Sequence, residues 1–240
     1  MDAGRARLAI GLLDLTDLSE RCTAADVDLL CQRAITAGTA AVCVWPDFVR
    51  QSAEALADAA IAVATVVNFP TGEERPFAVR TVTERALADG ADEIDVVLPY
   101  RAFQAGDLTW CHDLLGEVKA ATADRAHLKV ILETGELSGH HQMTAAARFA
   151  IDNGADFVKT STGKSAVSAT PDAVDALLAA IHGSDRVVGL KPSGGISTAE
   201  AADAYLAQAE SVMGPGYLAP ATFRFGASGV LDALLEVASG

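Results

Sequence analysis

The segment Gly90-Ala-Asp-Glu-Ile-Asp95 closes a helical pattern at its glycine and opens an apolar, β-branched run that continues to Leu98. Two further segments repeat the arrangement, Gly38-Thr-Ala-Ala-Val-Cys43 and Gly154-Ala-Asp-Phe-Val-Lys159. In each of the three, a helix is expected to end at the glycine and a strand to begin two or three residues later. The repeated unit is therefore a helix followed by a strand, which is the building block of α/β folds.

The same alternation extends outward over the whole chain. Strands are predicted at Gly11–Thr16, Ala40–Trp45, Ile61–Asn68, Glu93–Leu98, His127–Thr134, Phe157–Thr162, Arg186–Lys191 and Thr222–Gly226. Helices are predicted at Ala24–Ala37, Asp47–Ala59, Pro76–Asp89, Leu108–Ala123, Gln142–Asp152, Pro171–Ile181, Thr198–Glu210 and Ser228–Val237. Parallel pairing through right-handed crossovers follows, and eight such units in 240 residues predict an α/β fold of the (β/α)8 TIM barrel type, with outer helices and a short N-terminal segment.

Residues 1–240 are predicted to form a single TIM-barrel domain, because no linker, low-complexity tract or charge run marks a second one. The main rival is an open, doubly wound sheet. That fold is disfavoured because no Gly-x-Gly-x-x-Gly sequence follows the first predicted strand.

Charge and composition limit the partners and the compartment. The 32 acidic side chains against 18 basic ones give a net charge of -14, so neither nucleic acid nor an anionic membrane is an expected partner. An anionic small molecule would need a local basic site. The four cysteines show no Cys-x-x-Cys spacing, and no apolar run approaches the about 20 residues of a spanning helix. We therefore expect a cytoplasmic protein with reduced thiols.

Cys43, Asp95 and Lys159 each lie five residues after their glycine. Side chains alternate between the two faces of a strand, so equal offsets predict equal facing. If one of the three points into the barrel, all three do, at similar height. Barrel interiors favour valine, isoleucine and leucine, so an aspartate and a lysine in that position indicate a functional site.

Two lysines stand at the expected carboxyl ends of neighbouring strands, Lys159 on the sixth and Lys191 on the seventh, where barrel enzymes place their catalytic residues. Burial and a second ammonium group both lower the pKa of a lysine, and a neutral amine attacks a carbonyl carbon to form a Schiff base. The iminium accepts the electron pair of a carbon–carbon bond β to it. Asp95 is the candidate for moving protons in these steps.

Glycine-containing turns follow the last three predicted strands and predict a phosphate site. They are Thr162-Gly163-Lys164, Ser193-Gly194-Gly195-Ile196 and Phe225-Gly226-Ala-Ser228-Gly229. Barrels commonly bind phosphate in the loops after strands seven and eight, and small residues let backbone N–H groups approach the anion. Lys164 adds a positive charge there. None of the five histidines shows the spacing of a metal site, and His140-His141 is predicted to lie in a solvated loop.

Eight segments, spread nearly from end to end, carry a family resemblance. They are Leu13-Asp-Leu-Thr16, Val42-Cys-Val-Trp-Pro46, Val66-Val-Asn-Phe-Pro70, Ala91-Asp-Glu-Ile-Asp-Val-Val-Leu-Pro-Tyr-Arg101, Leu128-Lys-Val-Ile-Leu-Glu-Thr-Gly-Glu-Leu137, Lys159-Thr-Ser-Thr-Gly-Lys164, Gly189-Leu-Lys-Pro-Ser-Gly-Gly195 and Phe223-Arg-Phe-Gly-Ala-Ser228. In residues and spacing the chain resembles the 2-deoxyribose-5-phosphate aldolase family of class I aldolases.

The resemblance implies a TIM barrel and the reversible conversion of 2-deoxy-D-ribose 5-phosphate to D-glyceraldehyde 3-phosphate and acetaldehyde. It implies Lys159 as the Schiff-base lysine, Lys191 as the lysine that lowers its pKa, and Asp95 as the proton-transfer aspartate. The implied substrate pocket comprises Asp14, Thr16, Cys43 and Thr162. The implied phosphate site comprises Gly163, Lys164, Gly194, Gly195, Gly226 and Ser228.

The resemblance also implies a homodimer, no metal or organic cofactor, and a role in deoxyribonucleotide catabolism and carbohydrate degradation. The chain departs from some family members at two positions. Ser197 stands where they carry a basic residue, and Gly229 stands where they carry a second serine. Both changes remove candidate phosphate contacts.

Two other functions stay open on the sequence alone. A different Schiff-base lyase on the same barrel, such as a ketose-phosphate aldolase or a transaldolase-like enzyme, would need the same lysines. Substrate profiling with acetaldehyde against dihydroxyacetone phosphate separates these enzymes. A sugar-phosphate-binding protein that has lost catalysis would bind its ligand without turnover, and the intact Lys159, Lys191 and Asp95 disfavour it.

Overall fold

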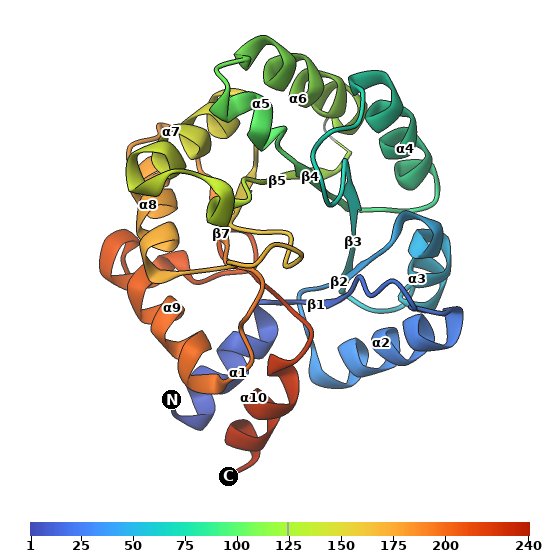
Figure 1. The fold of residues 1–240 in the computed structure, drawn as a ribbon. Helices are drawn as coiled ribbons and strands as arrows, with labels where there is room; N and C mark the ends of the chain where they lie inside the picture. The colour runs from blue at the N-terminus through green and yellow to red at the C-terminus, as the bar shows by residue number, and fades with distance from the viewer. Residues whose placement is uncertain (124) are drawn as a thin grey trace.

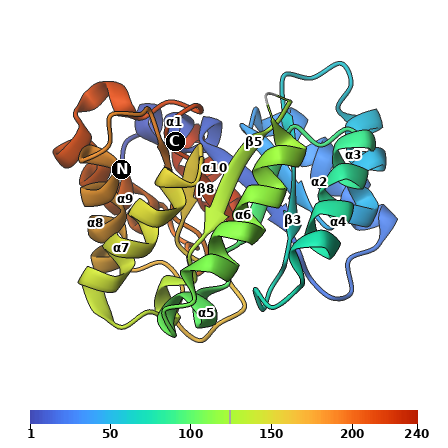
Figure 2. The ribbon, with the colours of Figure 1, turned by 90° about the horizontal axis from the view of Figure 1, so that it is seen from above.

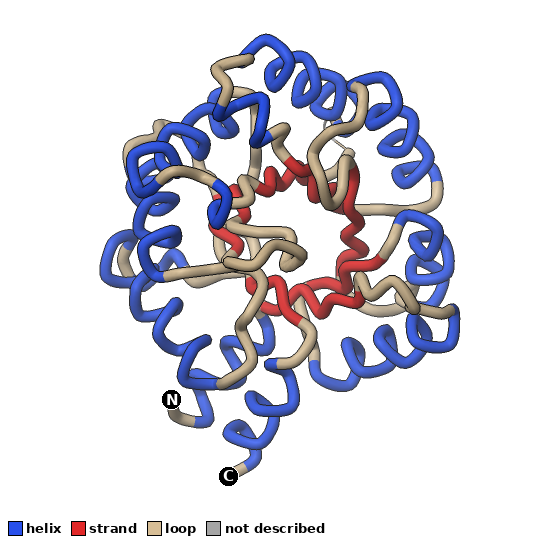
Figure 3. Tube along the Cα trace, in the orientation of Figure 1, coloured by secondary structure: helices blue, strands red, loops and turns tan. Residues whose placement is uncertain are grey.

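The computed structural model describes residues 1–123 and 125–240, and over them the chain forms the predicted (β/α)8 TIM barrel. The parallel strands are β1 (Leu13–Asp17), β2 (Ala41–Val44), β3 (Ala62–Val67), β4 (Glu93–Val97), β5 (His127–Ile131), β6 (Phe157–Lys159), β7 (Gly189–Lys191) and β8 (Phe225–Ala227). They follow one another around the ring in chain order, and backbone bridges from Leu190 to Phe223 and from Ser193 to Gly226 join β7 to β8. Figure 3 shows this ring of strands inside a ring of helices.

Helices cover the outer face of the strands (Figure 1). They are α1 (Ala3–Gly11), α2 (Ala24–Ala37), α3 (Val49–Ala55), α4 (Pro76–Ala88), α5 (Tyr100–Gln104), α6 (Leu108–Thr122), α7 (Gly139–Asp152), α8 (Pro171–His182), α9 (Ala199–Met213) and α10 (Val230–Ser239). The predicted N-terminal segment is α1, which packs beside α10. The short helix α5 follows β4 directly and lies at one end of the barrel (Figure 2).

Side-chain caps fix where several helices begin. The Thr23 hydroxyl accepts a hydrogen bond from the backbone N–H of Asp26, and the Asp26 carboxylate accepts one from Thr23, which forms a capping box for α2. Thr170 and Thr198 cap α8 and α9 in the same way through their hydroxyls. The α2 helix ends at Gly38 in the left-handed conformation, as the repeated glycine predicts.

The buried apolar side chains form two clusters. The larger one joins the strands to the surrounding helices, and a small one comprises Leu18, Cys43, Ala64 and Val66. Seven charged residues, each no more than 6% exposed, also lie inside the barrel, and we call them the barrel cluster. They are Asp14, Glu93, Asp95, Lys129, Lys159, Lys191 and Arg224. The barrel thus carries buried charge where aliphatic side chains usually pack.

Three predicted strands begin later than expected, and one predicted loop is helical. The β1 strand begins at Leu13, because Gly11 is the last residue of α1. The β7 strand begins at Gly189, because the side chain of Arg186 turns away to donate to the carbonyls of α7 and its following loop. The β8 strand begins at Phe225, because the Thr222 hydroxyl donates to the backbone at Tyr217. His140-His141, predicted in a loop, lies in the first turn of α7, and both side chains are exposed.

Candidate active site

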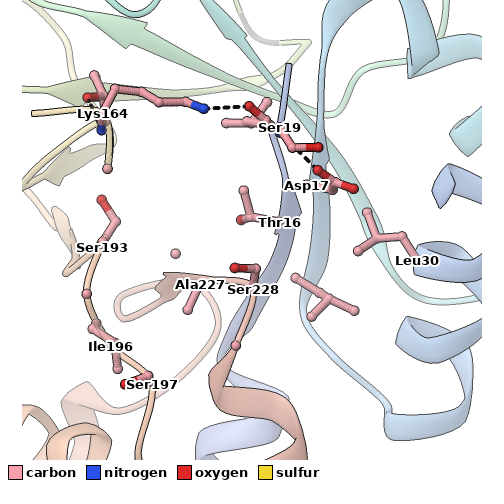
Figure 4. Close-up of a pocket in the computed structure, with 18 of the residues that line it drawn as sticks. Thr16, Asp17, Ser19, Leu30, Lys164, Ser193, Ile196, Ser197, Ala227 and Ser228 are labelled. Atoms are coloured by element: carbon pink, nitrogen blue, oxygen red, sulfur yellow. Dashed lines mark hydrogen bonds between the residues drawn. The ribbon is translucent and has the colours of Figure 1, made fainter. Parts of the chain in front are cut away.

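A cavity of about 750 Å³ opens at the carboxyl ends of β1, β6, β7 and β8, which is the end of the barrel where TIM-barrel enzymes place their active sites. The loops that follow these four strands and one side of α2 form its wall. Thr16 and Ser193 face each other across the open space (Figure 4). The Lys164 side chain crosses from the loop after β6 to donate to the Leu18 carbonyl at 2.8 Å.

The cavity gathers most of the residues predicted for a site. Those on its wall are Thr16, Lys159, Thr162, Gly163, Lys164, Gly194, Gly195, Gly226 and Ser228. The other predicted residues, Asp14, Cys43, Asp95 and Lys191, have no exposed surface and lie inside the barrel, behind that wall. Lys159 is therefore the member of the barrel cluster that reaches the cavity in the described part of the chain.

Lys159 is the last residue of β6 and is 3% exposed. Its Nζ lies 2.8 Å from Oδ2 of Asp95 on β4. Burial lowers the pKa of Lys159, and the neighbouring Lys191 ammonium lowers it further, while Asp95 acts in the opposite direction; the net result is a lowered pKa. The amine at the floor of the cavity is thus the cluster lysine that gives up its proton most readily.

Asp95 lies at the centre of the barrel cluster. Its Oδ1 accepts from Lys129 of β5 at 2.8 Å, and its Oδ2 accepts from Lys159 and from Lys191 of β7, each at 2.8 Å. Burial alone would raise the pKa of Asp95, but the three ammonium groups outweigh burial and hold the pKa well below its usual range. Asp95 is therefore a carboxylate in contact with the Lys159 amine.

Lys191 forms ion pairs with two carboxylates. Its Nζ lies 2.5 Å from Oδ2 of Asp14 on β1 and 2.8 Å from Oδ2 of Asp95. Burial opposes the charge, but the two carboxylates raise the pKa of Lys191 above its ordinary value. Lys159 and Lys191 are paired directly across β6 and β7, so the two lysines share one height in the barrel, yet their pKa values move in opposite directions.

Cys43 shares the inner face of the barrel with Asp95 and Lys159, as their equal spacing predicted. Burial raises the pKa of its thiol, which also interacts electrostatically with Lys191, Asp95 and Lys159. A buried, protonated thiol is a poor nucleophile.

Three members of the barrel cluster were missed by the sequence analysis. Lys129 contacts Glu93 at 2.5 Å and Asp95 at 2.8 Å, and Arg224 joins Asp14 at 2.6 Å to Glu93 at 2.9 Å. A signal for two of them exists in the sequence. Glu93 lies two residues before Asp95 and so faces the same side of the strand, and Lys129 interrupts the apolar run at Leu128–Leu132.

The glycine turns after β6, β7 and β8 approach one another at the cavity. Gly163, Gly194 and Gly195 all have a positive φ, between +75° and +81°. A Cβ on Gly194 would lie 2.5 Å from Oγ of Ser168, and a Cβ on Gly226 would lie 2.7 Å from Cβ of Ser193. Only glycine fits these two places, and the Gly194 N–H donates to the Gly226 carbonyl, which joins the turns after β7 and β8 beside the cavity.

Glu133, also absent from the sequence-based prediction, supports the loop after β6. Its carboxylate accepts from the Thr162 hydroxyl at 2.5 Å and from the Ser165 hydroxyl at 2.9 Å, and Glu133 itself has a φ of +51°. The Thr162 hydroxyl in turn accepts from the backbone N–H of Lys164 at 3.0 Å. A strained residue after β5 thus fixes the loop that carries Lys164.

No cluster of histidine, cysteine and carboxylate side chains that could hold a metal ion occurs in residues 1–123 and 125–240. That the protein works without a metal stays a prediction. Within the same residues, no helix is both long and apolar enough to cross a membrane.

The comparisons with known proteins agree with one another. Residues 8–230 match the protein family described as DeoC/LacD family aldolase. The deoxyribose-phosphate aldolase of Agrobacterium fabrum is 52% identical over 238 residues, which cover 98% of this chain and 92% of that protein.

Solved structures give the same picture of the fold. An apo structure from Toxoplasma gondii, proposed to be a deoxyribose-phosphate aldolase, superposes with a TM-score of 0.90 at 30% identity, over 99% of this chain and 96% of its own. A tetrameric deoxyribose phosphate aldolase from Aeropyrum pernix superposes with a TM-score of 0.79 over 98% of this chain and 92% of its own. At 24% identity, that second likeness supports the fold alone.

Proposed function

Because the chain belongs to the DeoC/LacD family of aldolases and is therefore a lyase, we propose that it cleaves 2-deoxy-D-ribose 5-phosphate reversibly to D-glyceraldehyde 3-phosphate and acetaldehyde, through a Schiff base on Lys159. The observation that carries the proposal is the Lys159 amine. It lies at the floor of the cavity, its pKa is lowered, and its Nζ is 2.8 Å from Asp95.

In the proposed cleavage, the neutral amine of Lys159 adds to the C1 aldehyde of the open-chain sugar, and loss of water gives the iminium. The C3 hydroxyl then loses its proton and the C2–C3 bond breaks. Its electron pair moves into the iminium and leaves an enamine on Lys159, while glyceraldehyde 3-phosphate departs. Protonation of the enamine carbon and hydrolysis of the new iminium release acetaldehyde and restore the amine.

Asp95 and Lys191 act on this amine from inside the barrel. The Asp95 carboxylate touches Nζ of Lys159, so it is placed to exchange protons with the amine during addition and loss of water, directly or through water. The Lys191 ammonium lies beside the same carboxylate oxygen and favours the neutral form of Lys159 by repulsion. Asp14 forms an ion pair with Lys191 at 2.5 Å and raises the pKa of that second lysine, which keeps it charged.

The substrate phosphate is proposed to bind at the far side of the cavity, in the turns after β6, β7 and β8. Ser228 and Gly229 immediately precede α10, so an anion there faces the positive end of that helix. Lys164 supplies a positive charge on the cavity wall. Thr16 and Thr162, from opposite walls, are placed to meet the sugar hydroxyls.

A coupled assay tests the proposal directly. Purified protein is incubated with 2-deoxy-D-ribose 5-phosphate. Released glyceraldehyde 3-phosphate is isomerised to dihydroxyacetone phosphate by an auxiliary isomerase and followed through reduction of that ketone by an auxiliary dehydrogenase. Turnover supports the proposed substrate. Absence of turnover together with cleavage of an aldol of dihydroxyacetone phosphate would assign the site to a ketose-phosphate aldolase instead.

Replacing Lys164 with alanine should raise KM for the phosphorylated sugar by about 10- to 100-fold, because a hydrogen bond to a charged group contributes about 1.5–3 kcal/mol. The rate with unphosphorylated 2-deoxy-D-ribose should stay within about twofold of wild type, since that substrate has no phosphate to lose. Lys119→Ala is the matched control, because Lys119 is a lysine of α6 paired with Asp156 and is not on the cavity wall. An equal loss on both sugars would contradict a phosphate role for Lys164.

The remaining parts of the proposal concern the protein as a whole. We propose that residues 1–240 act as one catalytic domain, that the protein forms a homodimer in the cytoplasm, and that it serves deoxyribonucleotide catabolism without a metal. The barrel, the acidic surface charge and the similarity to the Agrobacterium fabrum aldolase support this assignment. Size-exclusion chromatography with light scattering measures the oligomeric state.

A further inference from the structure

The barrel cluster extends below the amine that the proposed reaction uses. The Arg224 guanidinium, immediately before β8, donates to Oδ1 of Asp14 at 2.6 Å and to Oε1 of Glu93 at 2.9 Å. It lies 5.9 Å from the centroid of the Phe157 ring, on the side of the cluster away from the cavity. Neither Arg224 nor Glu93 is on the cavity wall in the described chain, so neither touches a bound substrate.

Two chains of contacts connect this lower layer to Lys159. One runs from Arg224 through Asp14 to Lys191, whose Nζ lies 2.5 Å from Asp14. The other runs from Glu93 to Lys129, whose Nζ lies 2.5 Å from Glu93 and 2.8 Å from Asp95. Both chains end on the Asp95 carboxylate, which contacts the Lys159 amine.

The cluster contains four basic and three acidic side chains, so it carries one surplus positive charge when every group is ionised. Loss of one proton balances it. A surplus positive charge with almost no contact to water raises the free energy of the folded protein. The cluster therefore loses a proton most readily from the amine that faces the cavity. That position is Lys159, because the other basic side chains each contact at least two carboxylates.

We propose that Arg224 and Glu93 are positioning residues of the aldolase reaction, which set the charge of the barrel cluster and thereby decide whether the Lys159 amine carries a proton. This inference rests on the proposed role of Lys159 as the Schiff-base residue. It extends control of that amine beyond Lys191 to a pair of residues that never meets the substrate.

The groups that face Lys159 from each side are consistent with this role. They are Asp14 of β1, Cys43 of β2, Glu93 and Asp95 of β4, Lys129 of β5, Glu133 after β5, Lys191 of β7 and Arg224 before β8. The β3 members of the small apolar cluster, Ala64 and Val66, bring no charge. Glu133 is held by hydroxyl groups of Thr162 and Ser165, and it forms no ion pair with the barrel cluster. The pKa values of Lys129, Lys191 and Arg224 are raised by carboxylates against burial, whereas the pKa of Lys159 is lowered.

The test is a set of substitutions with opposite expected signs. Arg224→Met removes one positive charge, so the Lys159 ammonium is favoured. The acidic limb of the pH profile of kcat/KM should therefore move to higher pH by about one unit or more. Glu93→Gln removes one negative charge, so the same limb should move down by a similar amount. The double variant restores the balance, and its limb should return close to the wild-type position.

The shape of the profile separates this role from a purely structural one. If Arg224→Met acts only through protonation, kcat/KM at any pH on the acidic limb falls about tenfold for each pH unit that the limb moves, but it recovers toward the wild-type plateau in alkali. Packing damage would instead lower the rate at every pH. Arg80→Met, on the surface of α4, removes the same charge from an exposed ion pair and should leave the profile unchanged. Arg224→Lys keeps the positive charge, so the acidic limb of the profile should stay at its wild-type pH.

Trapping the amine distinguishes failure of this inference from failure of the proposed function. Each variant is incubated with acetaldehyde across the pH range and reduced with borohydride, and the adduct on Lys159 is quantified by mass spectrometry. If wild type forms no adduct at Lys159, the proposed function is wrong. If the adduct forms but its pH midpoint is the same in wild type, Arg224→Met and Glu93→Gln, the inference is overturned and the function stands. If Arg224→Met does not fold, the downward movement of the midpoint in the nearly isosteric Glu93→Gln decides.

Discussion

Replacing Lys159 with alanine should lower kcat/KM for 2-deoxy-D-ribose 5-phosphate by at least about 10⁴-fold, which is within the range measured for loss of a covalent nucleophile. The reason is that no other amine lies on the cavity wall beside Asp95: Lys164 reaches across the mouth to Leu18, and Lys191 is sealed inside the barrel among the described residues. The coupled assay measures the rate, and borohydride reduction in the presence of acetaldehyde measures the covalent adduct.

The same variant should remain folded, and this follows from the charge of the barrel cluster. Without Lys159, three basic side chains face three carboxylates, and each carboxylate keeps at least one partner. The urea midpoint of Lys159→Ala should therefore stay close to that of wild type. Lys164→Ala is the control in the trapping experiment, since it removes a cavity lysine but leaves Lys159. An adduct of undiminished yield in Lys159→Ala would show that another residue is the nucleophile.

The order of strands and helices could be read from the sequence because each part of the pattern has a physical cause. Parallel strands buried on both faces appear as uninterrupted apolar runs, as in β2, and a glycine follows the helix before β2, β4 and β6. Strand ends were less predictable. The strand predicted at Phe157–Thr162 ends at Lys159, and the polar segment that follows turns away, with Thr162 hydrogen-bonded to Glu133.

The upper part of the candidate site was predictable for a related reason. A lysine or an aspartate in an apolar strand is anomalous, so Asp95 and Lys159 stood out against their neighbours. Arg224 gave no such signal, because its meaning depends on Asp14, which is 210 residues away in the chain. The charge balance of a buried cluster depends on which side chains meet, and a sequence without its fold does not specify that.

Replacing Lys191 with leucine should move the acidic limb of the activity profile upward by about one to three pH units, which is the effect of one close charge. The Lys191 ammonium repels a proton on Lys159 and neutralises Oδ2 of Asp95. Its removal leaves three carboxylates facing two fixed cations, so the cluster retains the proton on Lys159. At a pH on the acidic limb, kcat/KM should fall about tenfold for each pH unit that the limb moves, and it should recover partly in alkali.

The same substitution should also cost stability, by about 3–5 kcal/mol, since it removes one partner of a fully buried ion pair. The pKa of Asp14 is lowered in the fold, so its contribution is present above the unfolded carboxyl value and lost as the pH falls. The pKa of Lys191 is raised, so its contribution is present below the unfolded amine value and lost as the pH rises. The full loss is therefore expected between about pH 4 and about pH 10.

Urea unfolding at several pH values and the pH profile of kcat/KM together distinguish a structural role of Lys191 from an electrostatic one. The matched control is Lys119→Leu, which makes the same change at a half-exposed lysine of α6 and should alter neither measurement strongly. A variant that loses stability but keeps the wild-type acidic limb would mean that Lys191 only holds Asp14 and Asp95 in place. A variant whose limb moves upward while alkaline activity returns would mean that its charge sets the protonation of Lys159. The distances favour the second result, because a single carboxylate oxygen of Asp95 lies 2.8 Å from both lysines.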